Sequence, residues 1–141
     1  MSNGSGLRSW GLTLLRLVVG VIFLMHGGQK LFMGFHNVAG YLGSVGIPIP
    51  TLAAIVLTLV EFIGGIALIL GVLTRYVAAL LAIDMLVALI TVHMKHGFFV
   101  SEGGVEFPLL LFIANINLVL AGAGALSIET LRRKQTLPPT P

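Results

Sequence analysis

The stretch Leu52–Leu73, LAAIVLTLVEFIGGIALILGVL, decides the fold of this chain. It holds 22 residues and a single charged side chain, Glu61. A helix needs about 20 consecutive apolar residues to cross the hydrocarbon core of a bilayer. The stretch therefore predicts a transmembrane helix with one carboxylate near its middle.

Three further apolar segments lie on either side of this stretch. Trp10–Met33 precedes it, and Tyr76–Val92 and Phe107–Ile128 follow it. The connections are short, and the segments are too long and too uniformly apolar for the alternating strands of a membrane barrel. We therefore predict an all-α membrane protein, a four-transmembrane-helix bundle with helices at about 10–33, 52–73, 75–95 and 106–128.

The composition agrees with a chain whose solvent is lipid. Of its 141 residues, 57% are hydrophobic and 9% are charged, whereas soluble domains carry roughly 25% charge. The eight Lys and Arg residues are spread thinly, so they form no stripe for nucleic acid. The chain has no cysteine, which excludes disulfides, thiol redox chemistry and cysteine-ligated iron–sulfur clusters.

The basic residues predict the orientation in the cytoplasmic membrane. Five lie at one end of the predicted bundle and two, Lys30 and Lys95, lie at the other; the five are Arg8, Arg75, Arg132, Arg133 and Lys134. Basic residues gather on the cytoplasmic side of membrane proteins. We therefore expect both termini in the cytoplasm. Residues 1–130 would form the membrane domain, and 131–141 a disordered, basic and Pro-rich cytoplasmic tail.

Polar side chains inside the predicted helices form a first group of candidate residues. At about 1.5 Å of rise per residue they lie at similar depth, which predicts a buried polar network of Arg16, Glu61, Asp84 and Asn117. One interpretation is a carboxylate that carries protons or binds substrate. The other, which we favour, is an ion pair between Arg16 and Glu61 that fixes helix packing. Asp84 is the less explained of the two acids.

A second group lies near the non-cytoplasmic helix ends. His26 and Lys30 are four residues apart and share a helix face, while His93 ends the third segment and Glu106 opens the fourth. These four residues form a candidate quinone or substrate pocket, or else an interfacial cluster of snorkelling side chains.

Asp84 and His93 lie nine residues apart, half a turn round an ideal helix. Either the helix unwinds near its end or the two residues serve different surfaces.

The same residues bear on cofactors. His26 and His93 occur on different helices at one depth, as axial haem ligands do, but two histidines alone are weak evidence and we do not expect haem. No metal site is expected, since no cysteine assists the histidines. The sequence shows no intrinsic cofactor, and a quinone is the ligand that the pocket suggests.

An ordered set of short motifs resembles the DoxX family of small bacterial membrane proteins. After Arg16 the set runs through H-G-x-x-K-L (His26–Leu31), G-I-P-x-P (Gly46–Pro50), E-x-x-G-G-x-x-L-x-L-G (Glu61–Gly71), Thr74-Arg75, His93, G-G-x-E (Gly103–Glu106) and G-A-G-x-L-S-I-E (Gly122–Glu129). The family's usual final motif has Pro after its first Gly and ends in Asp, where this chain has Ala123 and Glu129.

The resemblance implies a four-helix membrane bundle and a link to redox metabolism. Related chains include the membrane subunit of a thiosulfate:quinone oxidoreductase, but the resemblance supplies no catalytic residues to carry over. The first hypothesis is thus a subunit of quinone-linked redox metabolism that anchors or serves a partner oxidoreductase. The alternatives are a non-enzymatic scaffold or assembly factor, and a small proton or solute carrier using Glu61 and Asp84. Expected partners are the bilayer and another protein or a second copy, not nucleic acid.

Cysteine labelling tests the orientation. With Ser44→Cys and Thr136→Cys introduced separately, a membrane-impermeant maleimide added to intact cells should label position 44 and leave position 136 unlabelled until the cells are opened. Labelling of position 136 from outside the cell would contradict the predicted orientation.

Overall fold

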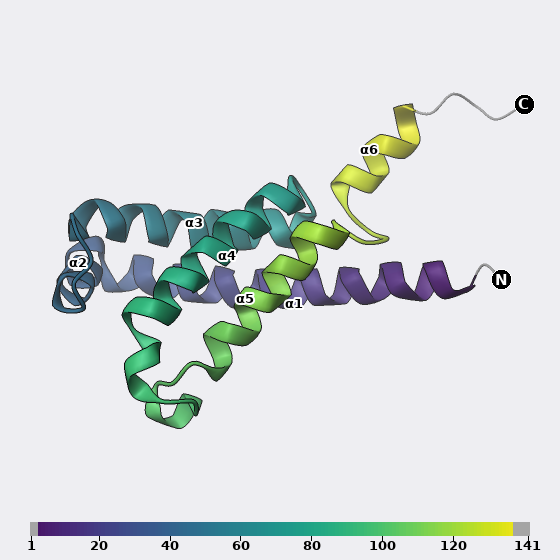
Figure 1. Cartoon of the computed structure of the whole chain (residues 1–141). Coiled ribbons are helices and arrows are strands. Elements are labelled where there is room, and N and C mark those ends of the chain that lie inside the picture. Colours follow the sequence, from purple (N-terminus) through teal and green to yellow (C-terminus); the bar gives the residue numbers. More distant parts are fainter. Residues whose placement is uncertain (1–2, 137–141) are drawn as a thin grey trace, which may run out of the picture.

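The computed structural model of the chain describes residues 3–136 as helices joined by turns, with no strand among them (Figure 1). This confirms the predicted all-α class. The elements are α1 (Asn3–Met33), α2 (Phe35–Ser44), α3 (Pro50–Leu70), α4 (Thr74–Thr91), the 3₁₀ helices η1 (His93–His96) and η2 (Val100–Glu102), α5 (Glu106–Ala121) and α6 (Ile128–Thr136).

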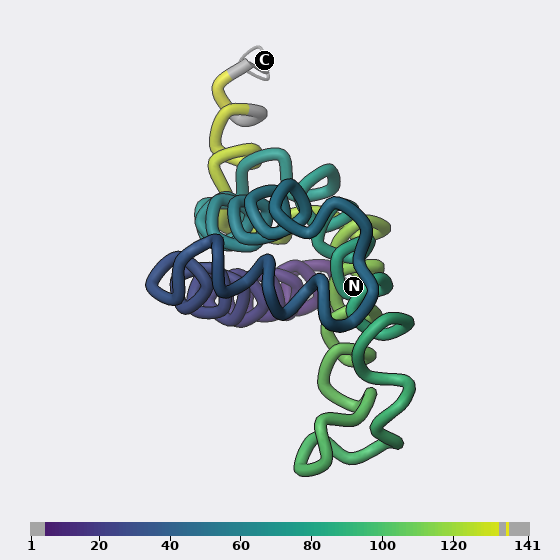
Figure 2. The backbone as a smooth tube through the Cα atoms, turned by 90° about the vertical axis from the view of Figure 1, so that its left-hand side faces the viewer, coloured from purple at the N-terminus to yellow at the C-terminus, as the bar shows by residue number. Residues whose placement is uncertain are grey.

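The long helices form two antiparallel pairs. α1 packs along α3, and α4 packs along α5. Figures 1 and 2 show that the α4–α5 pair crosses the α1–α3 pair obliquely and diverges from it toward η1 and η2. The short α2 sits across the same end of the α1–α3 pair. The two pairs meet through a core of large apolar side chains, among them Phe23, Leu68, Leu81, Leu111 and Leu118.

Glycines allow α1 and α3 to approach closely. A Cβ atom on Gly65 would collide with the backbone of Leu24, and one on Gly27 would collide with the backbone of Phe62. Gly20 is equally confined, since a Cβ there would lie 3.0 Å from the carbonyl oxygen of Gly65. Small residues at such crossings are typical of membrane helix pairs, where close backbone packing supplies much of the association energy.

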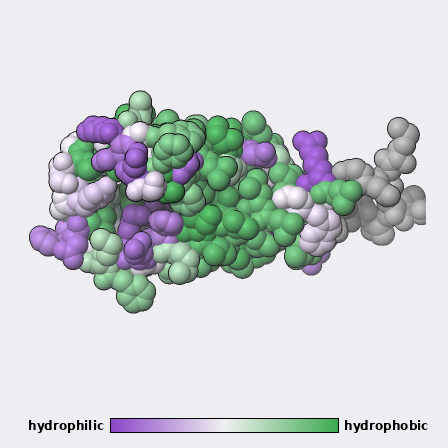
Figure 3. All heavy atoms as spheres, turned by 90° about the horizontal axis from the view of Figure 1, so that it is seen from below, coloured by the Kyte–Doolittle hydropathy of each residue, from purple (hydrophilic) through white to green (hydrophobic). Residues whose placement is uncertain are grey.

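The outward faces of the helices are apolar and exposed, as lipid contact requires. α1, α3 and α4 are each long and apolar enough to cross a membrane, and α5 is apolar but 16 residues long. Exposed side chains on these helices include Leu14, Val18, Val56, Ile63, Leu80, Ile83, Leu110 and Ile113. Figure 3 shows hydrophobic atoms over the middle of one face and hydrophilic atoms gathered mainly at the end that holds η1 and η2.

The C-terminal part differs from the sequence prediction. The fourth helix ends at Ala121, not near residue 128, because Gly122 and Gly124 adopt positive φ angles of 85° and 84°. A Cβ atom on Gly124 would lie 2.6 Å from Thr13 Oγ1, so the segment also needs glycine to pass close to α1. The predicted tail is helical as far as Thr136, as part of α6, and its remaining residues, 137–141, lie outside the described part of the chain.

Replacing Gly65 with alanine should separate α1 from α3. We expect Gly65→Ala to lower the unfolding free energy in detergent by about 1–3 kcal/mol, because the new methyl group overlaps backbone atoms that cannot move aside independently. Gly28→Ala is the matched control, since its Cβ would meet nothing closer than 3.9 Å. Equal unfolding curves for the two variants would contradict this account of the packing.

Candidate functional site

A cavity of about 540 Å³ lies where the two helix pairs diverge. Its walls come from α1, α2, α3, α4, the η1–η2 segment and the start of α5, and most of the lining side chains are apolar. Part of the rim is formed by Val56, Ile83 and Val87, which are exposed on membrane-spanning helices. The cavity therefore has a side that faces the lipid.

An ion pair lies in the cavity wall. Lys30 Nζ is 2.5 Å from Glu61 Oε2, and the two side chains are 24% and 4% exposed. Asp84 lines the same cavity from α4 and lies close enough to Lys30 and Glu61 to interact electrostatically with both. Its Oδ2 atom is buried and has no hydrogen-bond partner among the described residues. One ammonium thus serves two carboxyl groups, which leaves a charge to be neutralised by a proton or a ligand.

Two histidines complete the polar part of the lining. His26 Nδ1 lies 2.9 Å from the carbonyl oxygen of Ile22, and its ring stacks on Phe107 with centroids 6.2 Å apart. His93 Nδ1 lies 2.6 Å from the carbonyl oxygen of Gly103. A carbonyl only accepts, so each Nδ1 must carry the donated proton. An imidazole that carries its proton on Nδ1 offers Nε2 as the acceptor for a ligand.

The end of α4 explains how Asp84 and His93 reach one cavity. The α-helix stops at Thr91, and the chain continues as the tighter turn of η1. Asp84 and His93 both line the cavity, the first from α4 and the second from η1. The hypothesis that the two residues serve different surfaces is therefore wrong, and the α-helix ends before His93 by tightening into a 3₁₀ turn.

Glu106 does not join the predicted pocket. It opens α5 as expected, but its Oε1 accepts a hydrogen bond from the backbone N–H of Val100, at 2.5 Å, and it is absent from the cavity lining. The carboxylate holds the η2 turn against the start of α5. The two acids of the cavity are instead Glu61 and Asp84, which the sequence analysis had placed in a separate, deeper network.

Arg16 also has different partners from those predicted. Its side chain is 1% exposed, and it donates to the carbonyl oxygens of Leu68, of Ile69 at 2.8 Å, of Ala123 at 3.0 Å and of Leu126 at 2.5 Å. The predicted ion pair with Glu61 is thus absent, because Arg16 lies beside the C-terminal end of α3 while Glu61 lies two turns earlier. The free carbonyl groups at that helix end attract the guanidinium instead.

The asparagine inside the bundle is Asn115, not the predicted Asn117. Asn115 is fully buried, and its Nδ2 donates to the carbonyl oxygen of Leu111 at 2.9 Å. Asn117 is exposed, so it belongs to no interior network. The helical spacing of Leu111, Asn115 and Leu118 was the signal that could have identified the buried residue.

The comparisons with known proteins bear on the same segment. The DoxX family model matches residues 11–94, which include every charged residue and histidine of the cavity. The chain belongs to the DoxX family. It is 37% identical over 119 residues to "Putative oxidoreductase CatD" of Bacillus subtilis (strain 168), covering 84% of each chain.

A second DoxX relative is an inner membrane protein by name. "Inner membrane protein YphA" of Escherichia coli (strain K12) is 31% identical over 126 residues, covering 84% of this chain and 87% of its own. No solved structure matches this DoxX chain. The resemblance seen in the motifs is therefore confirmed, and the membrane assignment agrees with that relative's name.

The ion pair of this DoxX protein can be tested by its removal. Lys30→Met should lower the unfolding free energy in detergent by about 3 kcal/mol, because it leaves two carboxyl groups without their cation. Adding Glu61→Gln to Lys30→Met should recover part of that loss, since the unpaired buried charge is then gone. Lys95→Met, at an exposed lysine outside the cavity, is the matched control. Equal stability of Lys30→Met and the control would show that the pair contributes nothing.

Proposed function

We propose that this DoxX protein is a membrane subunit of a quinone-linked redox system and that the cavity between its helix pairs holds the quinone headgroup. A partner protein would oxidise the electron donor and pass electrons to the bound quinone. The main observation behind the proposal is that five polar side chains line one otherwise apolar cavity beside the lipid. They are His26, Lys30, Glu61, Asp84 and His93.

The dimensions and lining of the cavity suit an amphipathic ring. Its volume of about 540 Å³ falls within the range of about 300–1,000 Å³ found for small-molecule sites. Apolar side chains such as Leu57, Val60 and Phe107 supply surface for the ring faces. The rim at Val56 and Ile83 supplies a lipid-side passage for an isoprenoid tail. A soluble substrate would need no such passage.

The polar groups suit the proton chemistry of a quinone. Reduction to the quinol consumes two electrons and two protons, and it converts two carbonyl acceptors into two hydroxyl donors. Lys30 can donate to a quinone carbonyl. The Nε2 atoms of His26 and His93 and the unpartnered Oδ2 of Asp84 can accept hydrogen bonds from the quinol hydroxyls and exchange protons with them.

The relatives support the redox part of this proposal by name alone. The Bacillus subtilis protein carries the name "Putative oxidoreductase CatD", which mentions no quinone and no partner. A cytoplasmic-membrane location follows the name of the Escherichia coli relative, and the orientation with cytoplasmic termini follows the basic residues. The partner would then deliver electrons to a cavity near the opposite, outer end of the bundle.

Quinone titration of the purified protein tests the proposal. We expect a short-tailed ubiquinone or menaquinone analogue to bind the parent chain, and Asp84→Asn and His26→Ala each to weaken binding at least about tenfold. A tenfold loss corresponds to about 1.4 kcal/mol, which is of the order of one hydrogen bond between the protein and the quinone headgroup. Equilibrium dialysis in lipid nanodiscs measures the affinity directly, and thermal unfolding of each variant checks that the bundle is intact.

Glu106→Gln is the matched control for these two variants. The residue is an acid near the same end of the bundle, but it lies outside the cavity, and glutamine keeps an acceptor for the N–H of Val100. Its quinone affinity should equal that of the parent. No binding in the parent, or parent affinity in both cavity variants, would favour the scaffold hypothesis.

A further inference from the structure

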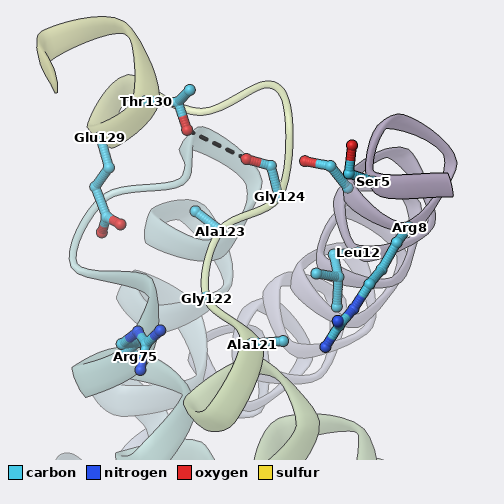
Figure 4. Close-up of a pocket in the computed structure, with 11 residues that line it drawn as sticks. Ser5, Arg8, Leu12, Arg75, Ala121, Gly122, Ala123, Gly124, Glu129 and Thr130 are labelled. Carbon is cyan, nitrogen blue, oxygen red and sulfur yellow. Dashed lines mark hydrogen bonds between the residues drawn. The ribbon is translucent and has the colours of Figure 1, made fainter. Parts of the chain in front are cut away.

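A second cavity, of about 490 Å³, lies at the opposite end of the bundle (Figure 4). It is bounded by the first turns of α1, the start of α4, the segment 121–124 and the start of α6, and it shares no lining residue with the cavity near η1 and η2. The quinone proposal makes no use of it. Its lining includes the charged residues Arg8, Arg75 and Glu129, whereas most of the residues that line the first cavity are apolar.

Two arginines from different helices supply its positive charge. Arg8 comes from α1 and Arg75 from α4, and Figure 4 shows them on opposite sides of the segment 122–124. Both are exposed, and within the described residues neither makes a hydrogen bond or an ion pair. The Arg75 guanidinium lies over Gly122, where a Cβ would come within 3.4 Å of its Nε. Both guanidinium groups are thus available to a ligand.

Glu129 reduces this charge without cancelling it. Its Oε1 accepts a hydrogen bond of 2.7 Å from the backbone N–H of Thr74, so the carboxylate stabilises the first turn of α4. Two guanidinium groups and one carboxylate leave one net positive charge in the lining. Ala123 and Gly124 also line the cavity, and no described residue accepts a hydrogen bond from their backbone N–H groups. This donor set matches a singly charged phosphodiester.

Aromatic residues indicate where the cavity lies relative to the membrane. Trp10 and Tyr76 are exposed and directly follow two lining residues, Ser9 and Arg75. Exposed Trp and Tyr side chains on membrane helices gather at the level of the lipid headgroups. The phosphate groups most abundant at that level belong to the phospholipids themselves.

We propose that this cavity binds the phosphate of an anionic phospholipid headgroup, held between Arg8 and Arg75. The acyl chains would run along the apolar outer faces of the bundle, and the phosphate would link α1 to α4 at the end opposite the quinone cavity. A free phosphate ion has the same recognition chemistry, so the experiment must distinguish the two sources. The site does not depend on the quinone proposal.

Lipid binding to the detergent-purified protein tests this site. Native mass spectrometry should show that phosphatidylglycerol binds the parent chain at least about tenfold more tightly than phosphatidylcholine, whose choline cation is disfavoured by a positive lining. The double variant Arg8→Gln/Arg75→Gln should lose this preference. Lys95→Gln, which removes an exposed basic residue near the other end, should keep it. Circular dichroism of the variants checks that the helices are retained.

Each outcome decides between the sources or against the site. Phosphatidylglycerol binding that resists millimolar inorganic phosphate and requires both arginines supports the lipid headgroup. Displacement by inorganic phosphate, with the same dependence on Arg8 and Arg75, supports the phosphate site and assigns it to a soluble ligand. An unchanged phosphatidylglycerol preference in the double variant overturns the proposal.

Discussion

The buried guanidinium of Arg16 is the constraint on which the rest of the structure depends. A charge in the interior of a membrane bundle must have its donors satisfied, and here backbone carbonyl groups serve instead of a carboxylate. Two of those carbonyls, on Leu68 and Ile69, are at the end of α3, and two, on Ala123 and Leu126, follow α5. The helix α5 therefore ends early, and the chain after it passes over the side chain of Arg16.

The partners of Arg16 leave Glu61 free to pair with a different residue, nearer the other end of α1. Because Arg16 is satisfied by carbonyls, Glu61 is left for Lys30, and the resulting pair lies against Asp84 in the cavity wall. The same helix therefore carries a cation that organises the fold and, fourteen residues later, a cation that belongs to the candidate site. The close packing of α1 on α3 at glycine residues fixes the positions of Arg16 and Lys30 along α3.

Because the two helix pairs diverge, the cavity between them has one side that faces the lipid. Packed along their full lengths, α3 and α4 would bury Glu61 and Asp84 without any cavity. Instead the pairs separate toward η1 and η2, and α2 and the η1–η2 segment cover the widened end. These short elements form part of the cavity wall, and Val56 and Ile83 of its lining are exposed on membrane-spanning helices. Such an arrangement suits a ligand that travels within the membrane.

The sequence by itself determined the all-helical membrane character, the places of the long helices and the shared face of His26 and Lys30, because length, hydropathy and helical period are local properties. Only the tertiary structure decided which charged side chains pair with one another and which pair with backbone carbonyl groups. Depth along a helix follows from residue number, but the neighbour at that depth depends on how helices cross and where they end. The end of α4 before His93, which lines the same cavity as Asp84, and the glycine break after α5, beside which Arg16 finds its carbonyl acceptors, depend on such long-range packing.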